Sequence, residues 1–153
     1  MLETPHVVVG AAIAVKVGDP ALAIPLALAS HFVLDKIPHW NPHLFTETQK
    51  LGHPAKNSTI LAVVDVTVAL ALGLFVASVY RNNLGMMITV IACCLVSVLP
   101  DLIKWPYYYL KNRWEPLKKW VFFERSIQAS APLVPGILTQ LLVVVTGLWW
   151  ALT

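Results

Sequence analysis

The chain has 153 residues, of which 58% are hydrophobic and only 12% are charged, and its mean hydropathy is +0.70. About a quarter of the residues of a typical soluble domain are charged, so this composition excludes an ordinary soluble enzyme, a disordered protein and a fibrous one. The net charge of +3 is too small to indicate nucleic acid as a partner, and the adjacent Cys93 and Cys94 cannot form a disulfide framework. We therefore expect a multi-pass membrane protein whose single domain comprises residues 1–153.

Apolar segments follow one another along the chain and predict four long membrane-spanning helices preceded by a short one. Residues 6–17 are apolar but cover only about 18 Å as a helix, which makes them a short N-terminal helix. The first long span begins after Asp19, a favourable N-cap residue that is followed by proline. A helix needs about 20 apolar residues to cross a bilayer. The four long spans are expected at residues 20–38, 58–80, 84–100 with its flanks, and 133–152.

Residues 104–131, between the last two spans, contain most of the Lys and Arg residues, and the expected loop at 40–56 carries two more lysines. The positive-inside rule places both segments in the cytoplasm, so that the N-terminus is cytoplasmic and the C-terminus lies outside. Within the basic segment, residues 117–128 have apolar side chains at helical spacing, which predicts an amphipathic helix on the inner leaflet. The expected fold is an all-α transmembrane bundle in the cytoplasmic membrane, with this interfacial helix on its cytoplasmic side.

Six ionisable side chains interrupt the apolar segments. An ionisable residue within a span costs roughly 2.5–3.5 kcal/mol on insertion scales, so each one is expected to have a partner or a function. The six come from four segments, and helix geometry places all of them toward the cytoplasmic side of the membrane. They are His6, His31, Asp35, His39, Asp65 and Asp101.

His31 and Asp35 are four positions apart and therefore share one helix face. An imidazole and a carboxylate at that spacing can ligate one metal ion, or two ions bridged by the aspartate. The alternative is a hydrogen-bonded His–Asp pair that stabilises helix packing. His6 and Asp65 at similar depth favour the metal, because clustered carboxylates in the membrane need a cation. We expect His6, His31, Asp35 and Asp65 to bind one or two divalent ions, with zinc the best match to these ligands.

The same residues carry a resemblance to known proteins. Thr4-Pro5-His6 before an apolar segment, followed by Ser-His-Phe-Val-Leu-Asp-Lys-Ile-Pro-His at 30–39, resembles the small multi-pass proteins grouped as membrane-bound metal-dependent hydrolases. The second stretch is also similar to a helix of zinc-dependent phospholipase C and its nuclease relatives, in which His and Asp hold zinc ions. The resemblance covers residues 4–39 well and Asp65 and Asp101 more faintly. It implies a zinc-dependent membrane hydrolase.

These observations lead to a first hypothesis, an integral-membrane hydrolase that cleaves a phosphoester or similar bond of a lipid with metal-activated water. Asp101 and His39 are the predicted catalytic residues, as general base or leaving-group acid. Membrane lipids are the expected partners. The residues expected to bind an anionic head group are Lys36, Lys104 and Arg125. Glu124 and Gln128, on the apolar face of the interfacial helix, are further candidate site residues.

The rival interpretation is a non-catalytic metal-binding membrane protein, or a small ion or proton carrier in which Asp65 acts as a relay. Five apolar segments are few for a transporter and contain no visible inverted repeat, although a homo-oligomer would supply further helices to enclose a pathway. Two residues have simpler alternatives: Asp101 ends a helix at the interface, and Glu124 reaches water beside Arg125.

Overall fold

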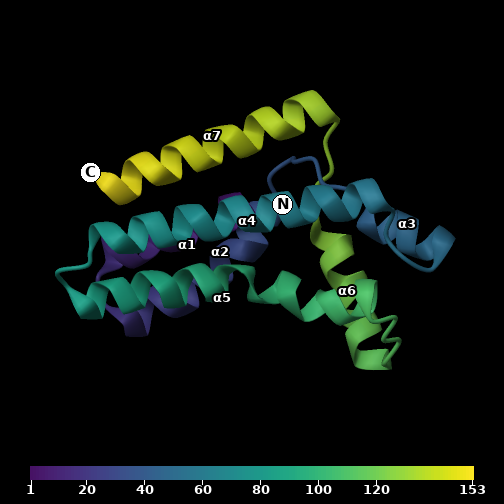
Figure 1. Cartoon of the computed structure of the whole chain (residues 1–153), viewed down its shortest axis with the longest axis horizontal. Coiled ribbons are helices and arrows are strands. Elements are labelled where there is room, and N and C mark those ends of the chain that lie inside the picture. The colour runs from purple at the N-terminus through teal and green to yellow at the C-terminus, as the bar shows by residue number, and fades with distance from the viewer.

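The computed structural model describes residues 1–153 and contains seven α-helices and no β-strand, which confirms the all-α fold. The helices are α1 (Glu3–Val17), α2 (Pro20–Asp35), α3 (Leu44–Leu51), α4 (Lys56–Val79), α5 (Leu84–Tyr109), α6 (Glu115–Ile127) and α7 (Leu133–Leu152). Helices α4, α5 and α7 run along the long axis of the molecule, and α3 and α6 lie together near one end (Figure 1). We call this end the polar end.

Three helices, α4, α5 and α7, are long and apolar enough to cross a membrane, which indicates a membrane protein. Much of their apolar surface is exposed, as at Leu70 and Leu142. The expected span at 20–38 is shorter than predicted, because α2 ends at Asp35 and has 16 residues. That length covers about 24 Å, less than the hydrocarbon core of a typical bilayer, so a fourth long span is not confirmed. The N-cap prediction for α2 is confirmed, since Asp19 Oδ1 accepts a hydrogen bond of 2.9 Å from Ala21 N.

Helix α1 is short but forms the centre of the bundle, where it packs against α2, α4, α5 and α7. Small side chains allow this close packing, and Ala11 and Ala12 are completely buried. A Cβ atom at Gly10 would lie 2.7 Å from the Cys93 carbonyl oxygen, so α1 and α5 touch through their backbones there. The first turn of α1, which contains His6, is therefore enclosed by other helices.

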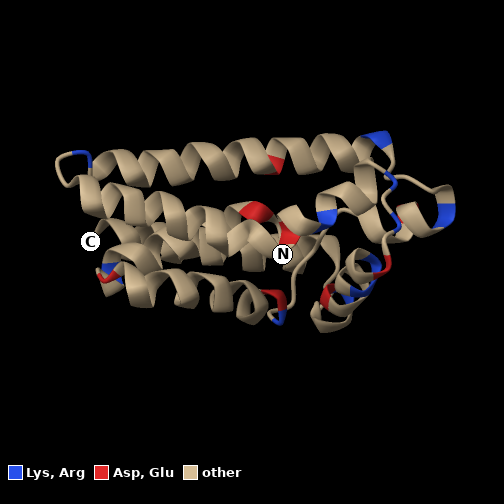
Figure 2. Cartoon of the chain, turned by 90° about the horizontal axis from the view of Figure 1, so that it is seen from below, with Lys and Arg blue, Asp and Glu red and all other residues tan.

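Most Lys and Arg residues lie at the polar end, whereas few lie at the opposite end (Figure 2). Residues 40–56 were expected to form a loop, but residues 44–51 within them form helix α3. The helix predicted at 117–128 is confirmed as α6, which buries Leu117, Val121 and Glu124. Its position on a membrane surface, and the side of the membrane on which it lies, stay predictions.

The chain that follows α6 lies alongside the end of α2 and fixes the relative position of the two helices. Ala129 N donates to Asp35 O at 2.9 Å, and His39 N donates to Ala129 O at 3.0 Å. Ala131 N in turn donates to His39 O at 2.8 Å. These bonds place the last turn of α6 beside the C-terminus of α2, and Glu124 and Gln128 face Asp35 as a result.

Candidate metal centre

Asp35, the last residue of α2, lies fully buried at the centre of a cluster of imidazoles. Its Oδ1 atom is 3.5 Å from His6 Nε2 and 3.9 Å from His39 Nε2, and its Oδ2 atom is 3.6 Å from His31 Nε2. The Met1 amino group also contacts Oδ1, and Gln128 Nε2 donates to Oδ2 at 3.3 Å. The sequence predicted the face shared by His31 and Asp35, and the structure brings His6 and His39 to the same carboxylate.

Each imidazole lies at metal-ligand spacing from the Asp35 carboxylate, although from different oxygens. Two atoms that each lie about 2.0–2.2 Å from a tetrahedral zinc ion are roughly 3.3–3.6 Å apart. His6 Nε2 is 3.5 Å from Oδ1 and His31 Nε2 is 3.6 Å from Oδ2, whereas Asp101 offers one oxygen within 4.8 Å of nitrogens of both rings. The donor set of two imidazoles and a carboxylate is one that zinc accepts in proteins.

The two imidazoles in this group have ring nitrogens without partners. Both nitrogens of His6 and the Nε2 atom of His31 are buried and make no hydrogen bond, which ordinarily costs about 1–3 kcal/mol for each group. His31 Nδ1 lies 2.8 Å from Ser97 O, so it carries the proton and leaves the Nε2 lone pair free. The rings of His6 and His31 stack with their centroids 4.2 Å apart, and one nitrogen of each lies within 4.8 Å of the other and of an Asp101 oxygen.

His39 is less available to a metal ion than His6 or His31. Its Nδ1 atom donates to Ile37 O at 2.7 Å, and its Nε2 atom accepts from Asn41 Nδ2 at 3.1 Å. Burial lowers the pKa of the His39 imidazole, so the ring is neutral near pH 7. This geometry suits a group that exchanges a proton at Nε2 better than a permanent ligand.

A second set of charges joins the cluster from α5 and α6. Glu124 Oε1 is 3.8 Å from His31 Nε2, and a carboxylate oxygen of Asp101 lies within 4.8 Å of nitrogens of both His6 and His31. The Lys104 ammonium is paired with Asp101 and with Glu124. Burial raises the pKa of the Glu124 carboxyl to about 7, although the nearby ammonium acts in the opposite direction.

Asp65 lies apart from the imidazoles and caps the start of α1. Its carboxylate accepts hydrogen bonds from Glu3 N at 2.5 Å, from Thr4 N at 3.2 Å and from Thr4 Oγ1 at 2.6 Å. A carboxylate at a helix N-terminus is stabilised by the unpaired N–H groups and the helix dipole. Asp65 was predicted as a metal ligand, but it is not among the groups that gather around His6 and His31, and we leave it out of the proposed ligand set.

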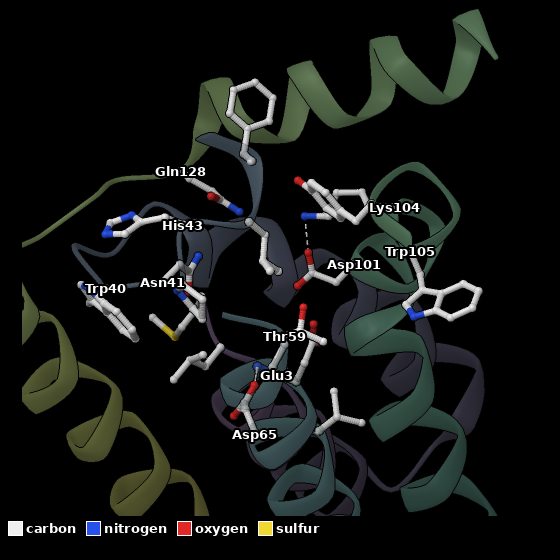
Figure 3. A pocket seen from close by; sticks show the side chains of 18 of the residues that line it. Glu3, Trp40, Asn41, His43, Thr59, Asp65, Asp101, Lys104, Trp105 and Gln128 are labelled. Atoms are coloured by element: carbon white, nitrogen blue, oxygen red, sulfur yellow. Dashed lines mark hydrogen bonds and ion pairs between the residues drawn. The ribbon is translucent and has the colours of Figure 1, made fainter. Parts of the chain in front are cut away.

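A cavity of about 740 Å³ lies beside the cluster, between α4, α5, α6 and residues 39–46 (Figure 3). Asp101 and His39, the predicted catalytic residues, line it together with Gln128. Its wall also contains Glu3, whose buried Oε2 atom has no hydrogen-bond partner. Glu3 was not among the residues predicted from the sequence, although an acid at the start of an apolar helix is a usable signal.

Of the basic residues predicted to bind a head group, only two line the cavity. Lys104 and Arg125 do so, whereas Lys36 is exposed and lies outside it. The Lys104 ammonium is already paired with carboxylates, and Arg125 Nη1 donates to Ser130 Oγ at 3.2 Å. Arg125 is therefore the one predicted cation in the cavity wall that carries no carboxylate partner.

No protein-family model, no curated protein and no solved structure matches this chain. The resemblance to membrane-bound metal-dependent hydrolases stays a prediction, and the geometry of the cluster carries the functional argument.

Proposed function

We propose that this protein is an integral-membrane metal-dependent hydrolase that cleaves a phosphoester or similar bond of a membrane lipid. The observation that carries the proposal is the set of unpartnered nitrogens of His6 and His31, buried next to Asp35 at separations that suit one ion. A buried cluster of this kind without a cation would leave polar groups unsatisfied. Zinc is the ion that best suits the donor set.

His6, His31 and Asp35 would hold the ion, and Glu124 lies close enough to His31 to add a fourth ligand or to orient that ring. When bound, such an ion lowers the pKa of a coordinated water toward neutrality. Asp101 and His39 line the cavity and also lie close to the cluster, Asp101 beside His6 and His31 and His39 beside Asp35. In this proposal His39 Nε2 and the Asp101 carboxylate are the atoms that accept or return a proton during hydrolysis.

The cavity supports a lipid as the substrate. It is flanked by exposed apolar side chains of two membrane-spanning helices, Val63 and Val66 of α4 and Leu102 and Trp105 of α5. A volume of about 740 Å³ is within the usual range for small-molecule sites. A lipid head group would enter sideways from the bilayer while its acyl chains stay against these side chains. By the positive-inside argument, the leaflet would be the cytoplasmic one.

One observation favours the alternative of a non-catalytic metal-binding protein. His6, His31 and Asp35 are completely buried and do not themselves line the cavity. Catalysis on a lipid would require a path to open from the cavity to the ion, or cavity-lining residues to relay protons between them. A bound ion that no substrate can approach would only stabilise the fold.

Two measurements on the purified protein separate these functions. Metal content is determined first, and release of water-soluble head groups from phospholipid vesicles is then followed with and without a chelator. The hydrolase predicts bound zinc and a release that the chelator abolishes and that His31→Ala lacks. His53→Ala is the matched control, because His53 is an exposed loop imidazole. Bound zinc with no release from any lipid class would support the non-catalytic alternative, and a protein without metal would overturn both.

A further inference from the structure

We propose that Lys104 takes the place of a second cation in the metal centre and thereby limits that centre to one divalent ion. The inference rests on the proposed metal centre, but it does not require hydrolysis. Its starting point is the position of the ammonium group, which contacts both Asp101 and Glu124 (Figure 3 draws the Asp101 pair). Lys104 is 7% exposed, and a lysine so buried is rare unless it is paired.

The two carboxylates that hold Lys104 also face the imidazoles. Glu124 uses one oxygen for the ammonium, and its other oxygen is 3.8 Å from His31 Nε2. Asp101 offers an oxygen within 4.8 Å of nitrogens of His6 and His31. The ammonium therefore lies where carboxylates from α5 and α6 converge next to imidazoles from α1 and α2. Asp and Glu oxygens with a neighbouring imidazole are also ligands for a divalent ion.

The local charges are consistent with this role. Asp35 already has a cationic partner in the Met1 ammonium, whereas Asp101 and Glu124 share the single ammonium of Lys104. Without the lysine, these two carboxylates would lose the cation that they share, and uncompensated buried charges are strongly disfavoured.

The position of Lys104 also suggests what a fixed ammonium would do there. Lys104 lines the cavity, and both carboxylates that hold it lie near the buried imidazoles. In hydrolases with two metal ions, the second ion helps to neutralise charge that develops on the reacting oxygens. A lysine in that place supplies a positive charge that cannot be lost to a chelator.

The test is the zinc stoichiometry of purified variants, measured by elemental analysis after equilibration with excess zinc and removal of loosely bound ions. We expect one ion per chain for the wild type and two for Lys104→Met, in which the apolar chain is kept and the charge is removed. Lys104→Arg keeps the charge and should stay at one ion. Lys118→Met is the control, because Lys118 is exposed and pairs only with Glu115 in α6.

Each outcome decides the matter. Two ions in Lys104→Met, or a Lys104→Met protein that folds only when zinc is supplied, supports the inference. One ion in a folded Lys104→Met protein overturns it, and so does a variant that fails to fold even with zinc while Lys104→Arg folds. Two ions in the wild type overturn it as well. Failure of the proposed centre itself looks different, because the wild type would then bind no zinc at all.

Discussion

Replacing Asp65 with alanine should destabilise the protein without removing its metal. The carboxylate accepts three hydrogen bonds from the first turn of α1, two from backbone N–H groups and one from the Thr4 hydroxyl. A hydrogen bond to a charged group contributes about 1.5–3 kcal/mol, but bonds made by one carboxylate are not additive. Asp65 lines the cavity, and water there would replace part of the loss. We expect Asp65→Ala to lower the free energy of unfolding by about 2–3 kcal/mol.

The assay is reversible unfolding in mixed detergent and denaturant, paired with the zinc content of the same samples. Asp65→Asn should recover part of the loss, because the amide oxygen still accepts from an N–H group. Asp19→Ala is the control: this exposed N-cap accepts one bond, at the start of α2, and its loss should cost about 0.5–1 kcal/mol. Unchanged stability with loss of zinc in Asp65→Ala would refute the capping role and restore Asp65 as a metal ligand.

Three further predictions follow from the packing, the topology and the cluster. Gly136→Ala should destabilise the folded protein by about 1–3 kcal/mol, because the new Cβ would lie 2.7 Å from Trp40 Cβ. Gly85→Ala is the control and should not, because its Cβ would have its nearest neighbour at 3.6 Å. Unfolding midpoints of the two variants check both expectations. A cysteine at the exposed position 112, in a variant without Cys93 and Cys94, should not be labelled by membrane-impermeant thiol reagents added to intact cells. Labelling from outside would show that the topology is opposite to the predicted one. Zinc affinity should fall steeply in acid, at a pH below the ordinary histidine range, because imidazole must be neutral to bind metal and the complete burial of His6 and His31 disfavours their charged forms. A flat titration would argue against histidine ligands.

The sequence predicted much of the fold because the strongest signals are local. The long apolar segments at 58–80 and 133–152 correspond closely to α4 and α7, and Asp19 does cap α2. Helix α3 was missed because it has only eight residues and low hydropathy. Its end is marked by Gly52, whose φ of 78° is the left-handed conformation that commonly follows a helix.

The candidate site was predictable where its residues share a helix and unpredictable where they do not. His31 and Asp35 lie on one face of α2, so their spacing alone pairs them. The partners of Asp65 are more than 60 positions away in the sequence, and no local pattern indicates that this acid caps another helix. Lys104 was expected to bind a head group, because the sequence could not show that Asp101 and Glu124 converge on its ammonium.

X-ray absorption at the zinc edge of the purified protein reports the ligand atoms of whatever ion is bound, and so decides whether the imidazoles hold it. We expect zinc with only nitrogen and oxygen neighbours at about 2.0–2.2 Å and a clear imidazole contribution. The zinc should be lost in His31→Ala and in Asp35→Ala and kept in His53→Ala. Sulfur neighbours at about 2.3 Å, or full zinc retention in both site variants, would contradict a centre built on His6, His31 and Asp35.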